Sequence, residues 1–205
     1  MAKLYFRYGA MGSSKTANAI MVKYNYWERG KNAILIGRKV VKVGVKFNAE
    51  TRVMLEDSCI SMEELDLEQV KNGAYDCLII DEAQFLTKDQ VELLVKIVDE
   101  YNVPVICYGL RTDFQGNFFE GSHWLLARAD AIEEVKTICW CGRKATMVAR
   151  VVDGRMEKSG DQIVIGGSDL YVSLCRRHYN EGRTGPEDGN GFPLRIDPAE
   201  AADTE

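Results

Sequence analysis

A short loop between a predicted strand and a predicted helix constrains the fold of this chain most strongly. Residues 3–8 form an aromatic-rich run typical of a strand, and apolar residues recur at helical spacing over residues 16–29. The loop between them, residues 9–16, reads Gly-Ala-Met-Gly-Ser-Ser-Lys-Thr. In such a setting, the backbone N–H groups of the loop and the dipole of the helix bind phosphate. The sequence therefore predicts a nucleotide-binding P-loop, in which Lys15 reaches the β- and γ-phosphates and Thr16 can ligate Mg²⁺.

One position of this loop departs from the usual pattern. A glycine normally precedes the lysine, and here that residue is Ser14. Glycine permits backbone conformations and close approaches of phosphate that serine resists. The loop can therefore also be interpreted as a simple Gly/Ser turn that caps a helix.

Predicted strands and helices alternate over the first two thirds of the chain. Further strands are expected at residues 33–37, 77–80 and 103–110, and capping boxes at Ser61 and Thr87 start helices, the first of which should run to about Asn72. Residues 40–58 show no clear pattern and are expected to be irregular. This alternation predicts an α/β fold with a mostly parallel sheet flanked by helices. Because ligands bind beyond the carboxyl ends of such strands, we expect residues 9–16, 81–85 and 110–119 to meet at one edge.

The strand at residues 77–80 ends in two carboxylates, Asp81 and Glu82. Asp81 is suited to hold Mg²⁺, directly or through water, and Glu82 could accept a proton from a nucleophile. Taken alone, the pair could also be an ordinary polar strand end. An upstream P-loop favours the functional interpretation.

Cysteine and histidine gather late in the chain in two short pairs. Cys139 and Cys141 are separated by one residue, and Cys175 precedes His178 by three positions. Three thiolates and one imidazole make a closed tetrahedral zinc set, which indicates a structural rather than a catalytic metal. The alternative is that these cysteines are free buried thiols.

The motifs and the composition suggest three segments. Residues 1–137 are expected to form the nucleotide-binding domain, residues 138–181 a small β-rich zinc-binding lobe with strands at 145–152 and 162–165, and residues 182–205 a disordered tail rich in glycine, proline and acidic residues.

The overall composition excludes several classes of protein. The chain has 205 residues, of which 46% are hydrophobic and 28% charged, so it can bury a core and is not largely disordered. Its net charge of −5 argues against non-specific binding of nucleic acid or of an anionic membrane. It has no apolar run long enough to span a membrane and no secretory signal at its start, so we expect a cytoplasmic protein.

The order of the motifs resembles a known family. The P-loop, the Asp-Glu-Ala-Gln-Phe run at 81–85, the Gly-Leu-Arg-Thr-Asp-Phe-Gln-Gly run at 109–116, the cysteine pairs and the Ile-Gly-Gly-Ser-Asp-Leu-Tyr run at 165–171 follow one another. This order resembles thymidine kinase of the cellular, zinc-containing type, which also occurs in bacteria and phages. The resemblance covers about residues 4–179. It implies a RecA-like P-loop domain with a lasso-like lid in the zinc lobe.

The resemblance also implies roles for particular residues. Glu82 would be the general base that takes the proton of the nucleoside 5′-hydroxyl. Magnesium would be held by Thr16 and Asp81. The ATP phosphates would lie against Gly9, Ala10, Met11, Gly12, Ser13, Ser14, Lys15, Thr16, Asp81, Glu82, Ala83 and Gln84. Thymidine would contact Met11, Phe85, Leu110, Phe114, Phe119, Ile163, Val164, Gly166 and Tyr171. Structural zinc would be bound by Cys139, Cys141, Cys175 and His178.

By the same resemblance, the chain would transfer the γ-phosphate of ATP to deoxythymidine, giving dTMP, as a homotetramer that dTTP inhibits. No nucleic-acid or membrane partner is expected. Two alternatives remain open. The chain could be a P-loop ATPase that depends on nucleic acid, since Asp-Glu-Ala-Gln also resembles motor sequences. It could also be a catalytically weak nucleotide-binding regulator, because Ser14 replaces the usual glycine.

Overall fold

A five-stranded sheet forms the centre of the molecule. The computed structural model describes residues 1–37, 40–46, 52–152, 154–162 and 170–186. The strands stand in the order β2-β5-β6-β1-β7, and every pairing between them is parallel. Their bounds are β1 Leu4–Tyr8, β2 Ala33–Ile36, β5 Cys77–Ile80, β6 Val105–Gly109 and β7 Ala131–Glu134. The predicted parallel α/β fold is confirmed.

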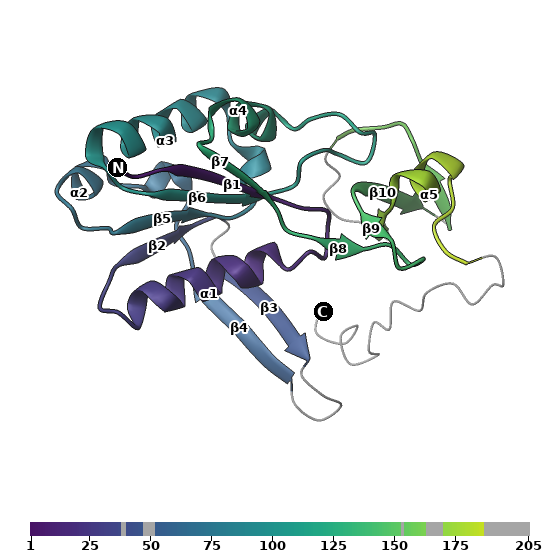
Figure 1. Cartoon of the computed structure of the whole chain (residues 1–205), viewed down its shortest axis with the longest axis horizontal. Helices are drawn as coiled ribbons and strands as arrows, with labels where there is room; N and C mark the ends of the chain where they lie inside the picture. The colour runs from purple at the N-terminus through teal and green to yellow at the C-terminus, as the bar shows by residue number, and fades with distance from the viewer. Residues whose placement is uncertain (38–39, 47–51, 153, 163–169, 187–205) are drawn as a thin grey trace.

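Helices cover both faces of this sheet (Figure 1). Helix α1 (Lys15–Trp27) lies on one face, and α3 (Lys88–Tyr101) and α4 (Glu120–Arg128) lie on the other. The two central strands β5 and β6 are buried at every residue. Such strands read as continuous apolar runs, which is why the sequence reveals them clearly.

The parallel register brings the predicted site segments to one edge. Tyr8 pairs with Gly109, and Ile80 pairs with Cys107. The P-loop, the segment after β5 and the segment after β6 therefore all begin at the carboxyl edge of the sheet.

The helix expected from Ser61 to Asn72 is wrong in detail. A 3₁₀ turn, η1 (Met62–Glu64), is followed by a separate short helix, α2 (Leu67–Lys71). Leu65 between them is extended and buried, and the Asp66 side chain accepts N–H bonds from Glu68 and Gln69. Asp66 thus caps a new helix instead of continuing the first.

Residues 40–58 also differ from the expectation of irregular structure. Strands β3 (Val40–Lys46) and β4 (Arg52–Ser58) pair as a two-stranded antiparallel ribbon. Val43 stands opposite Leu55, and Val45 stands opposite Val53. The partners in this register lie in two separate segments, so no single continuous pattern in the sequence indicates the ribbon. In Figure 1 the ribbon projects from the sheet on the side of α1.

The second half of the chain adds a smaller β-rich lobe beyond the carboxyl edge (Figure 1). Strands β8 (Thr137–Ile138) and β9 (Lys144–Ala145) form a hairpin. Strands β11 (Arg155–Glu157), β10 (Met147–Val152) and β12 (Leu170–Leu174) form an antiparallel sheet, and helix α5 (Arg176–Glu181) follows. The strand expected at 145–152 is thus divided between β9 and β10. Of the strand expected at 162–165, Gln162 is not in a strand, and the rest lies outside the described residues.

The tail is described only over residues 182–186, and the prediction of disorder falls mostly on residues 187–205, outside the described part. The division of the chain into three segments stays a prediction. Within the described ranges, no helix combines the length and the apolar character that crossing a membrane requires.

Candidate active site

The P-loop joins β1 to α1 and contains two residues with left-handed backbone. Gly12 has a φ of 67°, and Ser14 has a φ of 60°. Gly9 is required for a different reason, since a Cβ there would lie 2.4 Å from Ser13 Oγ and 2.4 Å from the carbonyl oxygen of Val135. Ser14 makes no capping bond through its side chain, while its carbonyl accepts the N–H of Asn18 at 3.0 Å. Ser14 therefore adopts the backbone conformation that glycine adopts without strain.

Lys15 begins α1 and folds back into the loop. Its Nζ donates to the carbonyl oxygen of Ala10 at 2.9 Å and to Ser13 Oγ at 3.3 Å. Burial lowers the pKa of Lys15, and the carboxylates of Glu82 and Asp81 act against this shift. The charges of both carboxylates thus act on Lys15, and the binding of phosphate by these three groups stays a prediction.

Thr16 and Asp81 meet directly across this edge. Thr16 Oγ1 donates to Asp81 Oδ2 at 2.8 Å. Burial raises the pKa of Asp81, the bond from Thr16 lowers it, and the charge of Glu82 raises it further. A hydroxyl and a carboxylate in contact are the oxygen ligands that Mg²⁺ accepts, so both residues fit the predicted ion.

Glu82 follows β5 in a strained conformation. Its φ is 55° and its ψ is 36°, in the left-handed region. It starts the 3₁₀ turn η2 (Ala83–Phe85), in which the N–H of Phe85 bonds to the carbonyl of Glu82 at 3.1 Å. A groove of about 480 Å³ opens beside it, lined by Asp81, Glu82 and Phe85 on one side and by Ser61, Met62 and Glu63 on the other.

Four of the residues expected to contact thymidine lie on segments 81–85 and 110–119. Phe85 is partly exposed, and its ring meets that of Phe119 edge-to-face, with centroids 5.7 Å apart. Phe114 is buried beneath the guanidinium of Arg150, and Leu110 is half-buried at the end of β6. These aromatic and aliphatic side chains could form the wall of a pocket for a flat base.

Met11 and Tyr171 come from the P-loop and from β12. The carbonyl of Met11 accepts a hydrogen bond of 2.6 Å from Ser173 Oγ. Because side chains two apart in a strand share a face, Tyr171 lies on the same face of β12 as Ser173. Ile163, Val164 and Gly166 lie outside the described residues.

Two residues that organise this region are absent from the sequence predictions. Asp113 is buried and accepts N–H bonds from Gln115 and Asn117 through Oδ1, and a bond from the Gln162 amide through Oδ2. Tyr179 donates from its hydroxyl to the carbonyl of Phe114 at 2.6 Å. An aspartate three residues before Gly116 is a turn signal that could have identified Asp113, whereas nothing local marks Tyr179.

The four expected zinc ligands come together in the smaller lobe. Their ligand atoms all lie within 4.8 Å of one another, with Cys139 Sγ 3.5 Å from His178 Nδ1 and Cys141 Sγ 3.9 Å from Cys175 Sγ. Tetrahedral zinc with Zn–S bonds near 2.3 Å requires sulfur atoms about 3.8 Å apart, so the cluster fits that ion. A bond from the backbone N–H of Arg143 lowers the pKa of the Cys141 thiol, which favours the thiolate that zinc binds.

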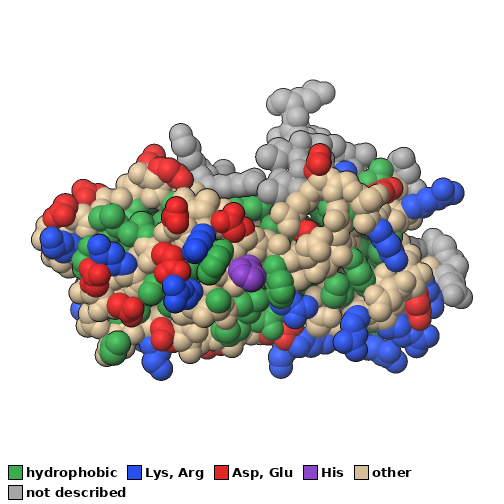
Figure 2. All heavy atoms as spheres, turned by 90° about the horizontal axis from the view of Figure 1, so that it is seen from above, with side chains coloured by type: hydrophobic (Ala, Val, Ile, Leu, Met, Phe, Trp, Pro, Cys, Tyr) green, Lys and Arg blue, Asp and Glu red, His purple; other side chains and the backbone are tan. Residues whose placement is uncertain are grey.

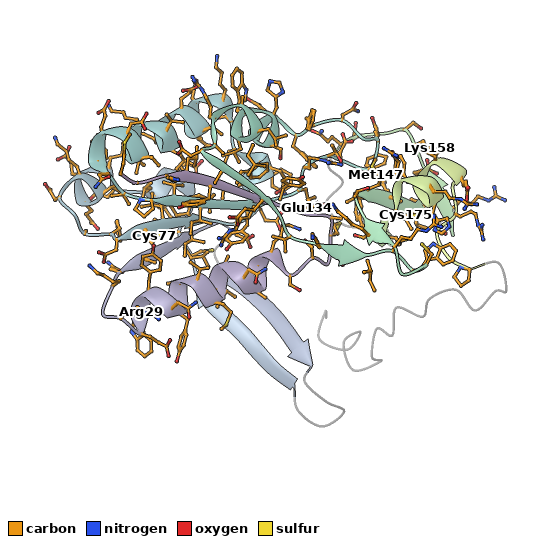
Figure 3. The ribbon with its side chains drawn as sticks, viewed as in Figure 1. Arg29, Cys77, Glu134, Met147, Lys158 and Cys175 are labelled. Carbon is orange, nitrogen blue, oxygen red and sulfur yellow. The ribbon has the colours of Figure 1, made fainter. Side chains whose placement is uncertain are left out.

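The other described cysteines are separate from this cluster. Figure 3 shows Cys175 at the opposite end of the molecule from Cys77, which lies in the main sheet. Burial raises the pKa of Cys77 to about 11, as expected for an inert core thiol. The metal cluster is also packed from one side, because the Trp140 ring stacks on His178 with centroids 4.1 Å apart.

Comparison with known proteins places the chain in a family. A family model described as thymidine kinase matches residues 2–179. A thymidine kinase from Mesorhizobium japonicum is 46% identical over 201 residues, which cover 94% of this chain and 98% of that protein. A thymidine kinase from Shewanella oneidensis is 43% identical over 88% of this chain and 98% of its own length. One from Yersinia pseudotuberculosis is 44% identical over 88% of this chain and 96% of its own length.

A solved structure of Bacteroides Pif1 bound to ssDNA is also similar in part, with a TM-score of 0.36 and 18% identity over 65% of this chain and 38% of that chain. A likeness this weak supports no argument about function. The family model and the relatives, in contrast, cover most of the sequence. The chain belongs to the thymidine kinase family.

Proposed function

We propose that this chain transfers the γ-phosphate of ATP to the 5′-hydroxyl of deoxythymidine, giving dTMP and ADP. The observation that carries the proposal is the bond of 2.8 Å from Thr16 Oγ1 to Asp81 Oδ2, which joins the end of the P-loop to the carboxylates that follow β5. Phosphoryl transfer requires little covalent chemistry from a protein, and it depends on positioned charges and an oriented hydroxyl.

The P-loop residues 9–16 bind the triphosphate through backbone N–H groups and through the ammonium of Lys15. That ammonium bonds to the carbonyl of Ala10 and to Ser13 Oγ within the loop. Thr16 and Asp81, which are in contact, would hold Mg²⁺. Ala83 and Gln84 would contribute backbone contacts to the phosphates, as the resemblance implies. When bound, the ion neutralises charge that develops on the phosphate oxygens.

Glu82 acts as the general base. The 5′-hydroxyl oxygen attacks the γ-phosphorus while its proton passes to the Glu82 carboxylate. The bond from the γ-phosphorus to the bridging oxygen breaks, and ADP leaves with the electron pair. The left-handed backbone of Glu82 supports this role, because strained residues persist mainly at functional sites.

The nucleoside pocket draws on both parts of the molecule. Phe85, Leu110, Phe114 and Phe119 supply apolar walls for thymine, with Met11 from the P-loop. Tyr171 lies near the deoxyribose. Contacts of thymidine with Ile163, Val164 and Gly166 stay a prediction from the resemblance, since these residues lie outside the described part of the chain. Zinc at the Cys139 cluster stabilises the lobe, because a lobe this small has little core of its own. By resemblance, the enzyme is a homotetramer that dTTP inhibits.

The test is ADP formation measured with each natural nucleoside and with none. We expect turnover that depends on deoxythymidine, and a loss of about 10²- to 10⁴-fold in Glu82→Gln without loss of ATP binding. Glu100→Gln, an exposed change on α3, is the matched control and should retain full activity. Equal ATP turnover without a nucleoside would contradict the proposal.

A nucleic-acid-dependent ATPase is the rival that the same motifs allow. Figure 2 shows Lys and Arg side chains gathered at the end that carries the zinc lobe. Several of these cations are paired, since Lys144 bonds to Glu134, and Arg177 and Arg183 approach Glu181. Paired cations are less available to phosphates, which disfavours the rival. Stimulation of ATP hydrolysis by DNA would reverse this preference, whereas binding of both substrates without transfer would indicate the regulator.

A further inference from the structure

Gln84 is buried beside Glu82 with both ends of its amide engaged. Its exposed fraction is 1%. Its Oε1 accepts the backbone N–H of Leu110 at 3.0 Å, and its Nε2 donates to Oε2 of Glu82. The reverse orientation of the amide would point a donor at the N–H of Leu110, so the partners determine which atom faces which neighbour. The side chain therefore connects the end of β6 to the carboxylate expected to act as the base.

Two glycines leave room for this connection. A Cβ on Gly109 would lie 2.9 Å from Gln84 Oε1 and 3.0 Å from the Gln84 backbone nitrogen. A Cβ on Gly121 in α4 would lie 2.3 Å from the carbonyl oxygen of Ala83 and 3.0 Å from that of Gln84. Neither glycine has a positive φ, so close approach and not backbone freedom is what requires them. The turn η2 is thus held between β6 and α4 by direct backbone packing.

A third contact joins α4 to the segment after β6. Ser122, next to Gly121 in α4, donates from Oγ to the carbonyl of Leu110, whose N–H bonds to Gln84. A non-glycine residue in left-handed backbone is sterically unfavourable, and it persists only where its surroundings fix it. The surroundings of Glu82 are the packed contacts of η2 with β6 and α4, and the Gln84 side chain bonds to the Glu82 carboxylate there.

We propose that Gln84 is a positioning residue that fixes the carboxylate of Glu82 for proton transfer. The inference rests on the proposed function. Gln84 engages Oε2, which leaves Oε1 of Glu82 to accept the proton of the 5′-hydroxyl as that oxygen attacks the γ-phosphorus and ADP departs. The role is distinct from phosphate binding, because the Gln84 side chain is committed to Leu110 and Glu82.

The test is a split between kcat and KM in Gln84→Met, which keeps the length of the side chain and removes both hydrogen bonds. We expect kcat to fall by about 10- to 100-fold, as for a misplaced catalytic group. The KM values for ATP and thymidine should change by less than about threefold, because neither substrate loses a contact. Gln69→Met, an exposed change on α2, controls for the substitution itself and should leave both parameters unchanged.

Gln84→Glu provides a second arm in case Gln84→Met does not fold. Glutamate keeps an acceptor for the N–H of Leu110 and places a repelling carboxylate next to Glu82, so the same fall in kcat is expected. Melting temperature and zinc content identify a folded variant. A raised KM for ATP with kcat retained would overturn the proposal in favour of phosphate binding, and so would unchanged kinetics in a folded variant.

Failure of this proposal is distinguishable from failure of the proposed function. If Glu82→Gln keeps full activity, the assigned base is wrong. If Glu82→Gln loses activity while both Gln84 variants keep theirs, only the positioning role is wrong. A residue that acts through Glu82 should also add little in the double variant Glu82→Gln, Gln84→Met, measured in single turnovers at high enzyme concentration. Losses that multiply in the double variant would contradict action through Glu82.

Discussion

Ser14 stands where glycine would adopt the same backbone without cost. Its φ of 60° and ψ of 27° lie in the left-handed region, and its exposed side chain makes no capping bond. The steric cost of this conformation for serine is about 1–2 kcal/mol, and glycine avoids it. Glycine also gives the unfolded chain more conformational freedom, which cancels part of that gain in stability. We expect Ser14→Gly to raise the free energy of unfolding by about 0.5–1 kcal/mol. Urea denaturation of the ligand-free protein measures this change.

Ser14→Ala is the control for this prediction. Alanine keeps the Cβ and hence the left-handed penalty, so its stability should equal that of the original chain within about 0.5 kcal/mol. Because the loop already has the conformation that glycine supplies, the KM for ATP should change little in Ser14→Gly. A glycine variant no more stable than the alanine variant would show that the backbone conformation is not strained.

Asp81 gives a prediction about pH. Burial raises its pKa above the ordinary value, so the folded state holds the proton more tightly than the unfolded state. Such a group stabilises the fold below the ordinary aspartate pKa of about 4, and this contribution is lost as the pH rises through the raised value. Asp81→Asn does not titrate. The melting temperature of the original chain should therefore fall relative to that of Asp81→Asn as the pH rises above about 4.

This comparison is made by thermal melting over a pH series without Mg²⁺ or nucleotide. Using the difference between the two proteins removes the contributions of carboxylates that do not interact with Asp81. A difference in melting temperature that does not vary with pH would contradict the assignment. With Mg²⁺ and ATP added, the original chain should gain more stability than Asp81→Asn, because the variant loses a ligand of the ion.

At the scale of elements, the sequence predicts those whose signal is continuous and local. The buried strand β5 and the capping box at Thr87, which starts α3, were both identified. The ribbon β3–β4 was missed, because its two strands pair across separate segments of the chain and neither segment shows a clear strand pattern alone. The break at Leu65 was missed because a capping box marks where a helix begins and not where it ends.

Gly121 in α4 yields a prediction in which the usual effect of alanine is reversed. In an exposed helix, Gly→Ala stabilises by about 0.5–1 kcal/mol. Here the new Cβ would lie 2.3 Å from the carbonyl of Ala83 and 2.8 Å from that of Leu86, so α4 or η2 must move. We expect Gly121→Ala to destabilise the protein by about 1–3 kcal/mol and to lower kcat by displacing Glu82. Thermal melting and steady-state kinetics check the two effects.

Gly37→Ala is the matched control for stability. A Cβ at Gly37 would lie 3.5 Å or more from its neighbours, and the φ of Gly37 is not positive. This variant should stay within about 0.5 kcal/mol of the original chain. If both variants were equally stable, close packing between α4 and η2 would not be what requires Gly121.

At the scale of the whole molecule, the predicted site is assembled from contacts between segments distant in sequence. Ser173 bonds to the carbonyl of Met11, and Gln162 bonds to Asp113. The motifs indicate which residues carry chemistry, because their types and local spacing suffice for that. They do not indicate these connections, since each partner is an ordinary polar residue that only the folded chain brings within reach.

The contact between Tyr179 and Phe114 predicts that the zinc cluster supports nucleoside binding at a distance. Helix α5 has six residues, too few to be stable alone, and it begins directly after Cys175 and contains His178. Removal of zinc should release α5 and with it the hydroxyl bond of Tyr179 to the carbonyl of Phe114, which fixes one predicted wall of the thymine pocket.

Tyr179→Phe removes that bond alone, and a loss of about 1 kcal/mol corresponds to a roughly fivefold weaker Kd for thymidine. Calorimetric titration should show this loss in Tyr179→Phe with zinc content and ATP affinity retained, and a larger loss after chelation. Unchanged thymidine affinity in both proteins would show that the lobe and the pocket are independent.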